Sequence, residues 1–272
     1  MSWRTVVIAN RCKLDLKMGC MVVRGEETKR VFIDEIAMLI IENTAVSLTA
    51  ALIAALTEKK VKIVFCDERR NPTAELVSYC GAHDSSRKIR TQINWDDGIK
   101  GDVWTEIVSE KIRNQADLLQ RYGYWEEERL LRNYLDEIEF NDAGNREGHA
   151  AKVYFNALFG KSFSRGQENT TNAALNYGYG LLLSAVNREI VANGYLTQLG
   201  IFHDNMFNHF NLASDLMEPF RVLADKTVIE KQWQEFTTKE KHEMIEILHE
   251  TVLIGETAQT VLNAIKIYTR SV

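Results

Sequence analysis

The sequence contains few prolines, no paired cysteines and no long hydrophobic run. Only two prolines occur in 272 residues, Pro72 and Pro219, and this scarcity favours long uninterrupted helices. The four cysteines are scattered without a CxxC pair, so we expect small buried hydrophobic residues rather than a zinc or redox site. The most apolar run, AVSLTAALIAAL, is too short to span a bilayer.

Signals for targeting and for covalent chemistry are also missing. The N-terminal stretch MSWRTVVIANR lacks the charged and apolar regions of a signal peptide, so we expect a cytoplasmic protein that does not contact a membrane. The sequence contains neither a GxSxG motif nor an evidently activated cysteine, so nothing in it indicates a covalent nucleophile. The absence of a P-loop sequence argues against ATP-driven chemistry.

The composition is that of an ordinary globular protein, but the charge is unevenly distributed. Hydrophobic residues make up 45% and charged residues 26% of the chain, which is long enough to bury a sizeable core. The net charge of −5 argues against a surface coated in basic charge. Residues 146–190 nevertheless carry five bases and three acids, whereas residues 117–142 carry eight acids and three arginines. This mildly basic stretch is compatible with local contact to phosphates, although five bases are a weak signal.

The hydrophobic periodicity changes character once along the chain. Short strand-like runs extend from residue 4 to about residue 80, interrupted by one amphipathic helix predicted over residues 47–60. Residues 81–90 are polar and turn-rich, as in a linker. The segments beyond the linker fit a helical period: 102–123, 128–139, 145–160, 170–194 and 239–270. The sequence therefore predicts an α+β protein, with a small β-rich, sandwich-like N-terminal domain over residues 1–84 and a larger all-α domain over residues 85–272.

The helix predicted over residues 145–160 carries a carboxylate at the head of its apolar stripe. Glu147 and Tyr154 fall on one face of this helix. Glu147 has a structural explanation, because a carboxylate in the first turn complements the helix dipole, with Asn145 near the N-cap. The functional alternative is a metal ligand or a general base. His149 points to a different side of the helix and cannot easily share a ligand with Glu147.

A second group of polar residues lies in IFHDNMFNHFNLASDLMEPFR, residues 201–221. Asp215 and Glu218 are one helical turn apart and resemble a capping box, and His203 could be a core histidine beside an aromatic residue. Combined with Glu147, however, they offer one imidazole and two carboxylates, with Asp215 as a further acid. This nitrogen and oxygen set suits Mg²⁺ or Mn²⁺. A metal in a basic-edged cleft predicts phosphodiester chemistry, in which it polarises a phosphoryl oxygen and activates a hydroxyl.

Polar side chains in and around the helix predicted over residues 170–194 could line the same cleft. The candidates for DNA contact are Arg146, Asn172, Asn176, Tyr177 and Arg188. Helical spacing leaves open whether Tyr177 or Tyr179 faces the cleft. Gly178 and Gly180 would allow a close approach, either by a ligand or by a neighbouring helix.

Four features, in this order and spacing, resemble one known family over essentially the whole chain: NREGHAAKVYF, TTNAALNYGYGLL, His203 and SDLMEPFR. The family is the CRISPR adaptation integrase, the first-numbered Cas protein, which captures invader DNA as new spacers. The form LMEPFR, with Glu where many members carry Asp, is similar to the type II-A branch. The resemblance implies a metal-dependent DNA endonuclease and integrase. It also implies that Glu147, His203 and Glu218 bind the metal and that Asp215 is a nearby functional acid.

The resemblance also implies a set of partners. Family members form a homodimer mainly through the N-terminal domain, and two dimers flank a dimer of the second-numbered Cas protein. The assembly binds a short double-stranded DNA, whose 3′-OH ends attack the repeat ends of the CRISPR array. Type II-A relatives also work with a ring-forming accessory protein and the RNA-guided effector nuclease. Two alternatives stay open: a general metal-dependent nucleic-acid phosphodiesterase, and a non-catalytic dimeric DNA-binding scaffold.

Overall fold

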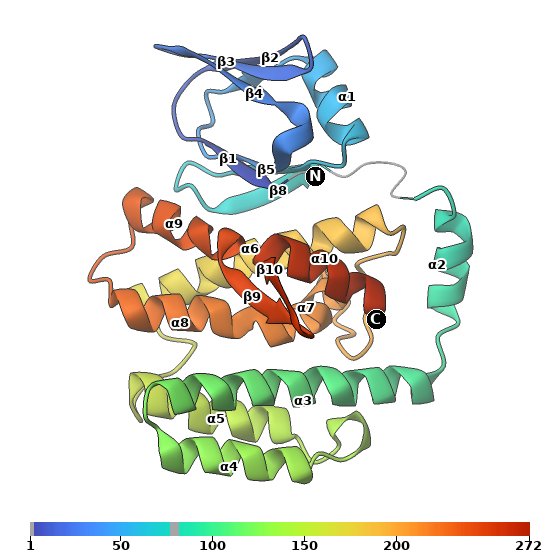
Figure 1. Ribbon diagram of the computed structural model, residues 1–272, viewed down its shortest axis with the longest axis vertical. Helices are drawn as coiled ribbons and strands as arrows, with labels where there is room; N and C mark the ends of the chain where they lie inside the picture. The colour runs from blue at the N-terminus through green and yellow to red at the C-terminus, as the bar shows by residue number, and fades with distance from the viewer. Residues whose placement is uncertain (1–2, 77–81) are drawn as a thin grey trace. The chain divides into compact units, whose positions relative to one another are not determined.

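The computed structural model describes residues 3–76 and 82–272. Contacts divide the chain into two compact units, one of Met1–Ser85 with Val191–Gly194 and one of Ser86–Ile190 with Tyr195–Val272. We call them the strand unit and the helical unit. The α+β class predicted from the sequence is confirmed, because strands build the first unit and mostly helices build the second (Figure 1).

The strand unit contains two four-stranded sheets. The first has the order β1 (Arg4–Ile8), β5 (Ile36–Ile41), β7 (Lys62–Cys66) and β8 (Pro72–Leu76). Strand β5 pairs in parallel with β1 and β7, and β8 is antiparallel to β7. The second sheet has the order β4 (Thr28–Phe32), β3 (Cys20–Arg24), β2 (Lys13–Lys17) and β6 (Ser47–Leu48). All six residues of β5 are buried, which explains why its sequence is continuously apolar rather than alternating.

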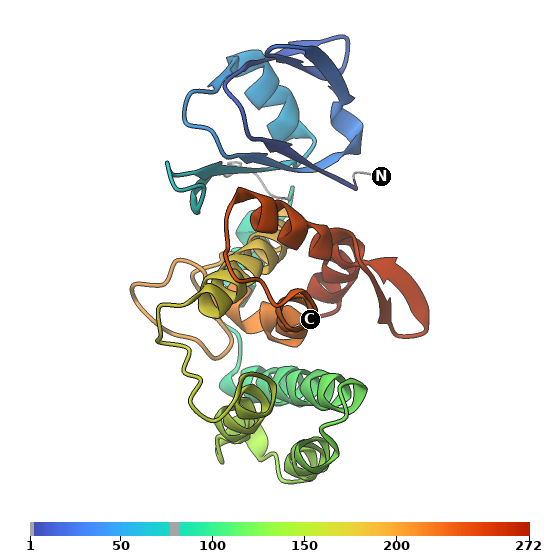
Figure 2. The ribbon, with the colours of Figure 1, turned by 90° about the vertical axis from the view of Figure 1, so that its left-hand side faces the viewer.

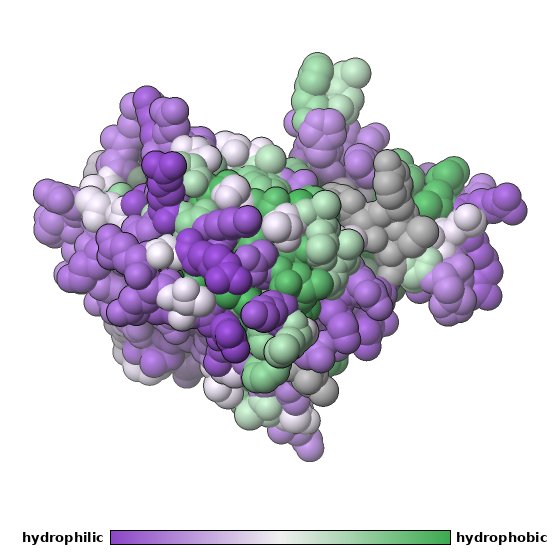
Figure 3. Space-filling model, turned by 90° about the horizontal axis from the view of Figure 1, so that it is seen from above, coloured by the Kyte–Doolittle hydropathy of each residue, from purple (hydrophilic) through white to green (hydrophobic). Residues whose placement is uncertain are grey.

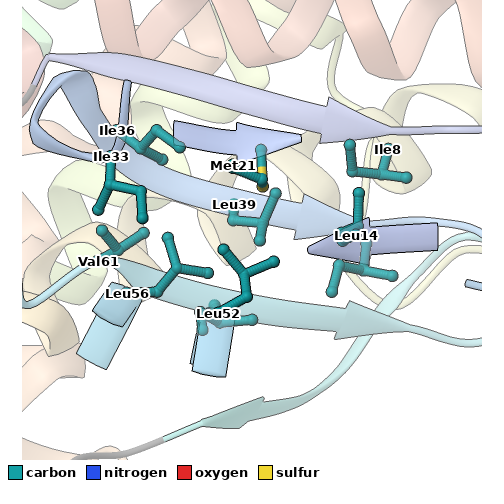
Figure 4. Packing of buried hydrophobic residues seen from close by; sticks show 11 residues of the cluster. Ile8, Leu14, Met21, Ile33, Ile36, Leu39, Leu52, Leu56 and Val61 are labelled. Atoms are coloured by element: carbon teal, nitrogen blue, oxygen red, sulfur yellow. The ribbon is translucent and has the colours of Figure 1, made fainter. Parts of the chain in front are cut away.

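One hydrophobic core joins these two sheets and helix α1 (Ala50–Glu58). Leu14 and Met21 from the second sheet, Leu39 from the first, and Leu52 and Leu56 from α1 are all fully buried in this cluster (Figure 4). Helix α1 begins after Thr49, whose hydroxyl accepts a hydrogen bond from the Leu52 amide. The 3-10 turn η1 (Ile33–Glu35) adds Ile33 to the core. The sandwich-like arrangement therefore has a direct packing basis.

The helical unit is organised around one long helix, α3. Its elements in chain order are α2 (Ser85–Ile93), α3 (Asp97–Arg121), α4 (Trp125–Asp136), η2 (Phe140–Asp142), α5 (Arg146–Phe159), α6 (Thr170–Ala192), α7 (Asn211–Met217), η3 (Glu218–Phe220), α8 (Arg221–Lys231), α9 (Thr238–Ile245), η4 (Glu246–His249), β9 (Thr251–Ile254), β10 (Thr257–Thr260) and α10 (Val261–Ser271). Helix α3 packs against α4, α5, α7, η3 and α8. Figures 1 and 2 show α3, α4 and α5 side by side.

The prediction of continuous helix over residues 239–270 is wrong in its middle. A two-stranded antiparallel hairpin, β9 and β10, separates α9 from α10 and projects from the helical unit (Figure 2). Ile254 pairs with Thr257, so Gly255 and Glu256 form a two-residue loop, and Gly255 has a φ of +58°. A left-handed glycine in a two-residue loop and the β-branched residues beside it favour a hairpin. The predicted all-α domain is therefore mostly helical.

Two further predictions can be compared with the described residues. Cys20 and Cys66 are buried, as expected of small hydrophobic side chains, whereas Cys12 is half-buried and Cys80 lies outside the described residues. No helix in the described ranges is both long enough and apolar enough to cross a membrane.

At Gly178, an added Cβ would lie 2.7 Å from the Cβ of Ala224, so this glycine allows α6 and α8 to pack closely.

Candidate metal centre

Two of the predicted metal ligands converge on a lysine. Glu147 at the start of α5 and Glu218 at the start of η3 both reach Lys111 of α3. The Lys111 ammonium donates a hydrogen bond to Glu147 Oε1 and forms an ion pair at 2.6 Å with Glu218 Oε2. The Glu218 contact lacks the directionality of a hydrogen bond, since that oxygen has no hydrogen-bond partner among the described groups. The two carboxylates are thus already gathered around one positive charge.

The charges in this group are mostly shielded from solvent. The side chains of Lys111 and Glu218 are 7% and 2% exposed, and that of Glu147 is 25% exposed. Burial by itself lowers the pKa of Lys111, but the charges of Glu218 and Glu147 outweigh it and raise the pKa above its ordinary value. Lys111 is therefore held as an ammonium between two carboxylates.

The start of α5 fixes the backbone of Glu147. Asp142, at the end of η2, accepts hydrogen bonds from the Arg146 amide at 2.7 Å and from the Glu147 amide at 3.1 Å. Asn145 occupies the N-cap position in a left-handed conformation, but its side chain makes no capping hydrogen bond. The carboxylate of Asp142, rather than the side chain of Asn145, thus accepts the hydrogen bonds of the first amides of α5. The side chains of Ala150 and Tyr154, further along α5, are completely buried. Glu147 therefore projects from a helix that is firmly packed against the rest of the unit.

His203 is held by the buried carboxylate of Asp215. The ring Nδ1 lies 2.5 Å from Asp215 Oδ1, and the His203 amide donates to the same oxygen at 3.1 Å. The other oxygen, Oδ2, accepts from the amides of Ile201 at 2.6 Å and Phe202 at 3.1 Å. Asp215 is completely buried, whereas the His203 side chain is 39% exposed. Asp215 therefore orients the ring and leaves Nε2 for another partner.

The segment that carries His203 is fixed by close packing as well. Phe202 stacks on Trp104 of α3 with the ring centroids 4.3 Å apart, and His203 meets the edge of the same indole. A Cβ added to Gly200 would collide with the carbonyl oxygen of His203 and would lie 2.8 Å from Asp215 Oδ2. A glycine is thus required where the backbone wraps around the Asp215 carboxylate.

His203, Glu218 and Glu147 lie in one electrostatic neighbourhood. The hydrogen bond to Asp215 is the largest cause that raises the pKa of His203; burial opposes it, and the charges of Asp215, Glu218 and Glu147 add to it. Among the described residues, no three His, Cys, Asp or Glu side chains converge closely enough to hold a metal as they stand. Lys111 lies between the two glutamates instead.

A second network adjoins Glu218 through Arg221. Arg221 pairs with Glu218 Oε1 at 3.2 Å, and its guanidinium lies 4.8 Å from the ring centroid of Tyr179. The Arg165 guanidinium lies 5.1 Å from the centroid of the same ring. The Tyr179 hydroxyl donates to buried Asp225 at 2.5 Å. Of the two tyrosines that helical spacing left open, Tyr179 is therefore linked to the carboxylate group through Arg221.

The five candidates for DNA contact make local contacts of their own, and two of them, Asn172 and Asn176, accept hydrogen bonds from Arg165. Arg146 pairs with Glu137 of α4 at 3.0 Å. Asn172 is buried and donates to the backbone oxygens of Ser164 and Gln167, which closes the loop before α6.

The other three lie along α6. Asn176 is exposed and accepts a hydrogen bond from Arg165 at 2.5 Å. Tyr177 is buried against Phe236, with ring centroids 5.6 Å apart. Arg188 is mostly buried and pairs with Glu189 at 2.8 Å, and burial lowers its pKa. The structure thus brings Glu147 and Glu218 to Lys111 and His203 to Asp215, and it connects Asn172 and Asn176 to Arg165.

Sequence reasoning missed Lys111, Arg221, Arg165, Asp225 and Gly200. Lys111 had a detectable signal, because a charged residue falls on the apolar stripe of α3 between Val108 and Ile112, both fully buried. A lysine at such a position needs a buried acid as its partner. The partners themselves lie 36 and 107 residues further along the chain, beyond the reach of a local pattern.

A family model and a known relative each match almost the whole chain. The family model described as CRISPR associated protein Cas1 matches residues 5–266. The CRISPR-associated endonuclease Cas1 of Neisseria meningitidis is 38% identical over 271 residues, which cover 97% of this chain and 89% of the relative.

Solved structures share the fold at lower sequence identity. A casposase bound to its integration product has a TM-score of 0.74 and 17% identity, and the match covers 100% of this chain and 91% of the casposase chain. A chain of a Cas6-RT-Cas1–Cas2 complex has a TM-score of 0.74 and 16% identity, and the match covers 98% of this chain and 34% of that chain. At these identities the likeness concerns the fold.

Proposed function

The chain belongs to the CRISPR associated protein Cas1 family, and from that membership we propose that it is a metal-dependent DNA endonuclease and integrase of CRISPR adaptation. It would act in the cytoplasm and insert short double-stranded DNA into a CRISPR array by attack of 3′-OH ends on phosphodiesters. The observation that carries the proposal is the convergence of Glu147 and Glu218 on one cation beside an oriented His203.

The residues present fit a divalent metal. Two carboxylates that face a shared positive charge and an imidazole oriented through its Nδ1 form the mixed oxygen and nitrogen set that Mg²⁺ or Mn²⁺ accepts. Glu147, Glu218 and His203 would hold the ion. When bound, such an ion polarises a phosphoryl oxygen and favours ionisation of the attacking hydroxyl.

Asp215 acts in this proposal as a positioning residue. Its two oxygens are occupied by three backbone amides and by His203 Nδ1, so it has no free lone pair directed at the substrate. By accepting a hydrogen bond from Nδ1–H it fixes the tautomer whose Nε2 can bind a cation. The functional acid implied by the resemblance would thus serve to orient the His203 ring.

Arg221 supplies positive charge next to Glu218, and Arg165 lies over the Tyr179 ring that Arg221 also contacts. Guanidinium groups bind phosphate oxygens in a bidentate manner, so both residues are suited to contact the DNA backbone once the substrate arrives. Arg146, Asn172, Asn176, Tyr177 and Arg188 stay predictions as DNA contacts. The local pairing of Arg146 and Arg188 with acids would have to be exchanged for phosphate.

The proposed partners are a second copy of this chain, the Cas2 protein and double-stranded DNA. The similar solved structures include a chain of a Cas6-RT-Cas1–Cas2 complex and a casposase bound to its integration product, and they support Cas2 and DNA as partners. Trp3, Met18 and Phe32 of the strand unit are large exposed hydrophobic residues, which suits an interface between copies. Figure 3 shows hydrophobic residues gathered among hydrophilic ones on the face seen from above. The type II-A branch, its accessory ring protein and its effector nuclease stay predictions.

An integration assay with matched variants tests the proposal. We expect Glu147→Gln and His203→Ala to reduce transfer of a labelled duplex into a repeat-bearing plasmid by at least about a hundredfold, because each removes a ligand. Glu250→Gln, at the ion pair with Lys226 elsewhere in the helical unit, is the control and should integrate normally. Normal integration by a folded Glu147→Gln protein would contradict the assignment.

Two further measurements, hydrolysis of free nucleic acid and DNA binding in EDTA, separate the alternatives. A general phosphodiesterase would hydrolyse free nucleic acid without Cas2 or an array. A non-catalytic scaffold would bind DNA in EDTA and would be indifferent to the loss of Glu218.

A further inference from the structure

We propose that Lys111 is a competing counter-ion of the metal centre: its ammonium holds Glu147 and Glu218 together in the absence of metal and must leave before a metal can bind between them. The inference rests on the proposed function, because it assumes that these carboxylates are metal ligands. It adds a specific role for a residue that the metal chemistry itself does not require.

The positions of the three groups make metal and lysine mutually exclusive. Lys111 Nζ is within hydrogen-bond distance of Glu147 Oε1 and lies 2.6 Å from Glu218 Oε2. A Mg²⁺ ion bound by the same two oxygens would lie about 2.1 Å from each of them. The ion and the ammonium would therefore occupy nearly the same point, where two positive charges repel strongly and no solvent separates them.

The exchange is chemically feasible because the lysine stem is flexible and an acceptor lies one helical turn away. Gln115 is also on α3, four residues after Lys111, so the two side chains share a face of the helix. The Gln115 amide oxygen is buried and, within the described ranges, has no hydrogen-bond partner. An ammonium that swings away from the glutamates would satisfy this oxygen, which lowers the cost of leaving.

The competition predicts that metal affinity rises when the lysine charge is removed. In wild-type protein, part of the metal-binding free energy is spent on displacing Lys111, so the apparent affinity is reduced in proportion. Since hydrogen bonds to charged groups are strong, we expect Lys111→Met to bind Mn²⁺ about tenfold more tightly or better. The same variant without metal should unfold at a lower temperature, because Glu147 then loses its ammonium partner and the buried Glu218 keeps only Arg221.

The test measures Mn²⁺ binding by calorimetry and thermal unfolding with and without Mn²⁺, on full-length protein without DNA. Lys226→Met is the control, because Lys226 also pairs with an acid, Glu250 at 2.8 Å, in the helical unit. We expect a lower Kd and a larger Mn²⁺-induced increase in Tm for Lys111→Met alone. If that variant folds only when Mn²⁺ is added, the proposal is equally supported. Lys111→Gln, which keeps hydrogen-bond donors without the charge, repeats the binding measurement if Lys111→Met does not fold at all.

Two negative results have different meanings. If wild-type protein binds Mn²⁺ and the affinity of the Lys111 variants is equal or weaker, the counter-ion role is refuted and the metal centre stands. If neither wild-type protein nor the Lys111 variants bind Mn²⁺, the metal centre fails together with the inference.

Discussion

Replacement of Asp215 by asparagine tests whether one buried carboxylate holds the His203 segment in place. Asp215 is completely buried, and its oxygens accept four hydrogen bonds. Oδ2 accepts from the amides of Ile201 and Phe202, and Oδ1 accepts from the amide and the ring Nδ1 of His203. An asparagine has the same shape but carries an NH₂ group in place of one oxygen. The NH₂ group would replace either Oδ2, which accepts from two amides, or Oδ1, which accepts from the amide and the ring of His203, so two of the four hydrogen bonds would be lost.

The expected cost follows from these lost bonds. Hydrogen bonds to a charged acceptor contribute about 1.5–3 kcal/mol each, so the loss of two predicts a decrease of about 3 kcal/mol or more in the free energy of unfolding of the helical unit. This is a large part of a stability of about 5–15 kcal/mol for a typical domain. The ring of His203 would also lose its fixed tautomer, which predicts a decrease of about 10- to 100-fold in integration or in metal affinity.

Hydrogen exchange measured on peptides that contain Ile201, Phe202 and His203 provides the local readout, and urea unfolding provides the global one. In wild-type protein the three amides should be protected, and in Asp215→Asn their exchange should accelerate by at least about tenfold. Asp117→Asn is the control, because Asp117 forms an exposed pair with Arg132 and should change stability by less than about 1 kcal/mol. Unchanged protection of the three amides, with unfolding like that of wild type, would refute the positioning role of Asp215.

Two further variants probe the packing and the buried charge of the helical unit. Gly200→Ala should destabilise the protein by about 1–3 kcal/mol in urea and reduce integration, because the new Cβ collides with His203 and Asp215; wild-type behaviour would show that the backbone can move aside. Burial raises the pKa of Asp225 to about 6, although hydrogen bonds from Tyr179 and Tyr154 oppose the shift. The folded pKa exceeds the unfolded one, so the stability from the protonated form is present below about pH 4 and is lost as the pH rises through 6. Relative to wild type, Asp225→Asn should therefore gain up to about 3 kcal/mol between pH 4 and pH 7 in urea unfolding, and a difference independent of pH would contradict this assignment.

Local patterns in the sequence predicted the parts of the fold that depend on local physics. Strand β5 and the helix that carries Glu147 follow from hydrophobic periodicity, because burial of one face or of both faces leaves a direct trace in the order of residues. The hairpin β9–β10 was missed because its two short strands lie between amphipathic helices. Only Gly255 and the β-branched residues mark it.

The contacts between distant residues could not be predicted in the same way. Asp215 and Glu218 were grouped by their spacing of three, but this spacing could not reveal that Asp215 binds the His203 segment. Lys111 reaches its two acids through the packing of α3 against α5 and η3, which no local rule specifies. The metal ligands themselves stay a prediction, and the described geometry supports it by bringing Glu147 and Glu218 to one charge.

The three proposed metal ligands are each held by different neighbouring residues before any metal binds. Asp142 fixes the helix start below Glu147, Asp215 orients His203, and two cations, Lys111 and Arg221, neutralise Glu218. The carboxylates are therefore balanced in charge without metal, unlike small metal sites whose ligands gather only when the ion binds. Metal binding at such a centre would be an exchange of cations within a folded protein, so its affinity would depend on the positive charge released as much as on the ligands gained.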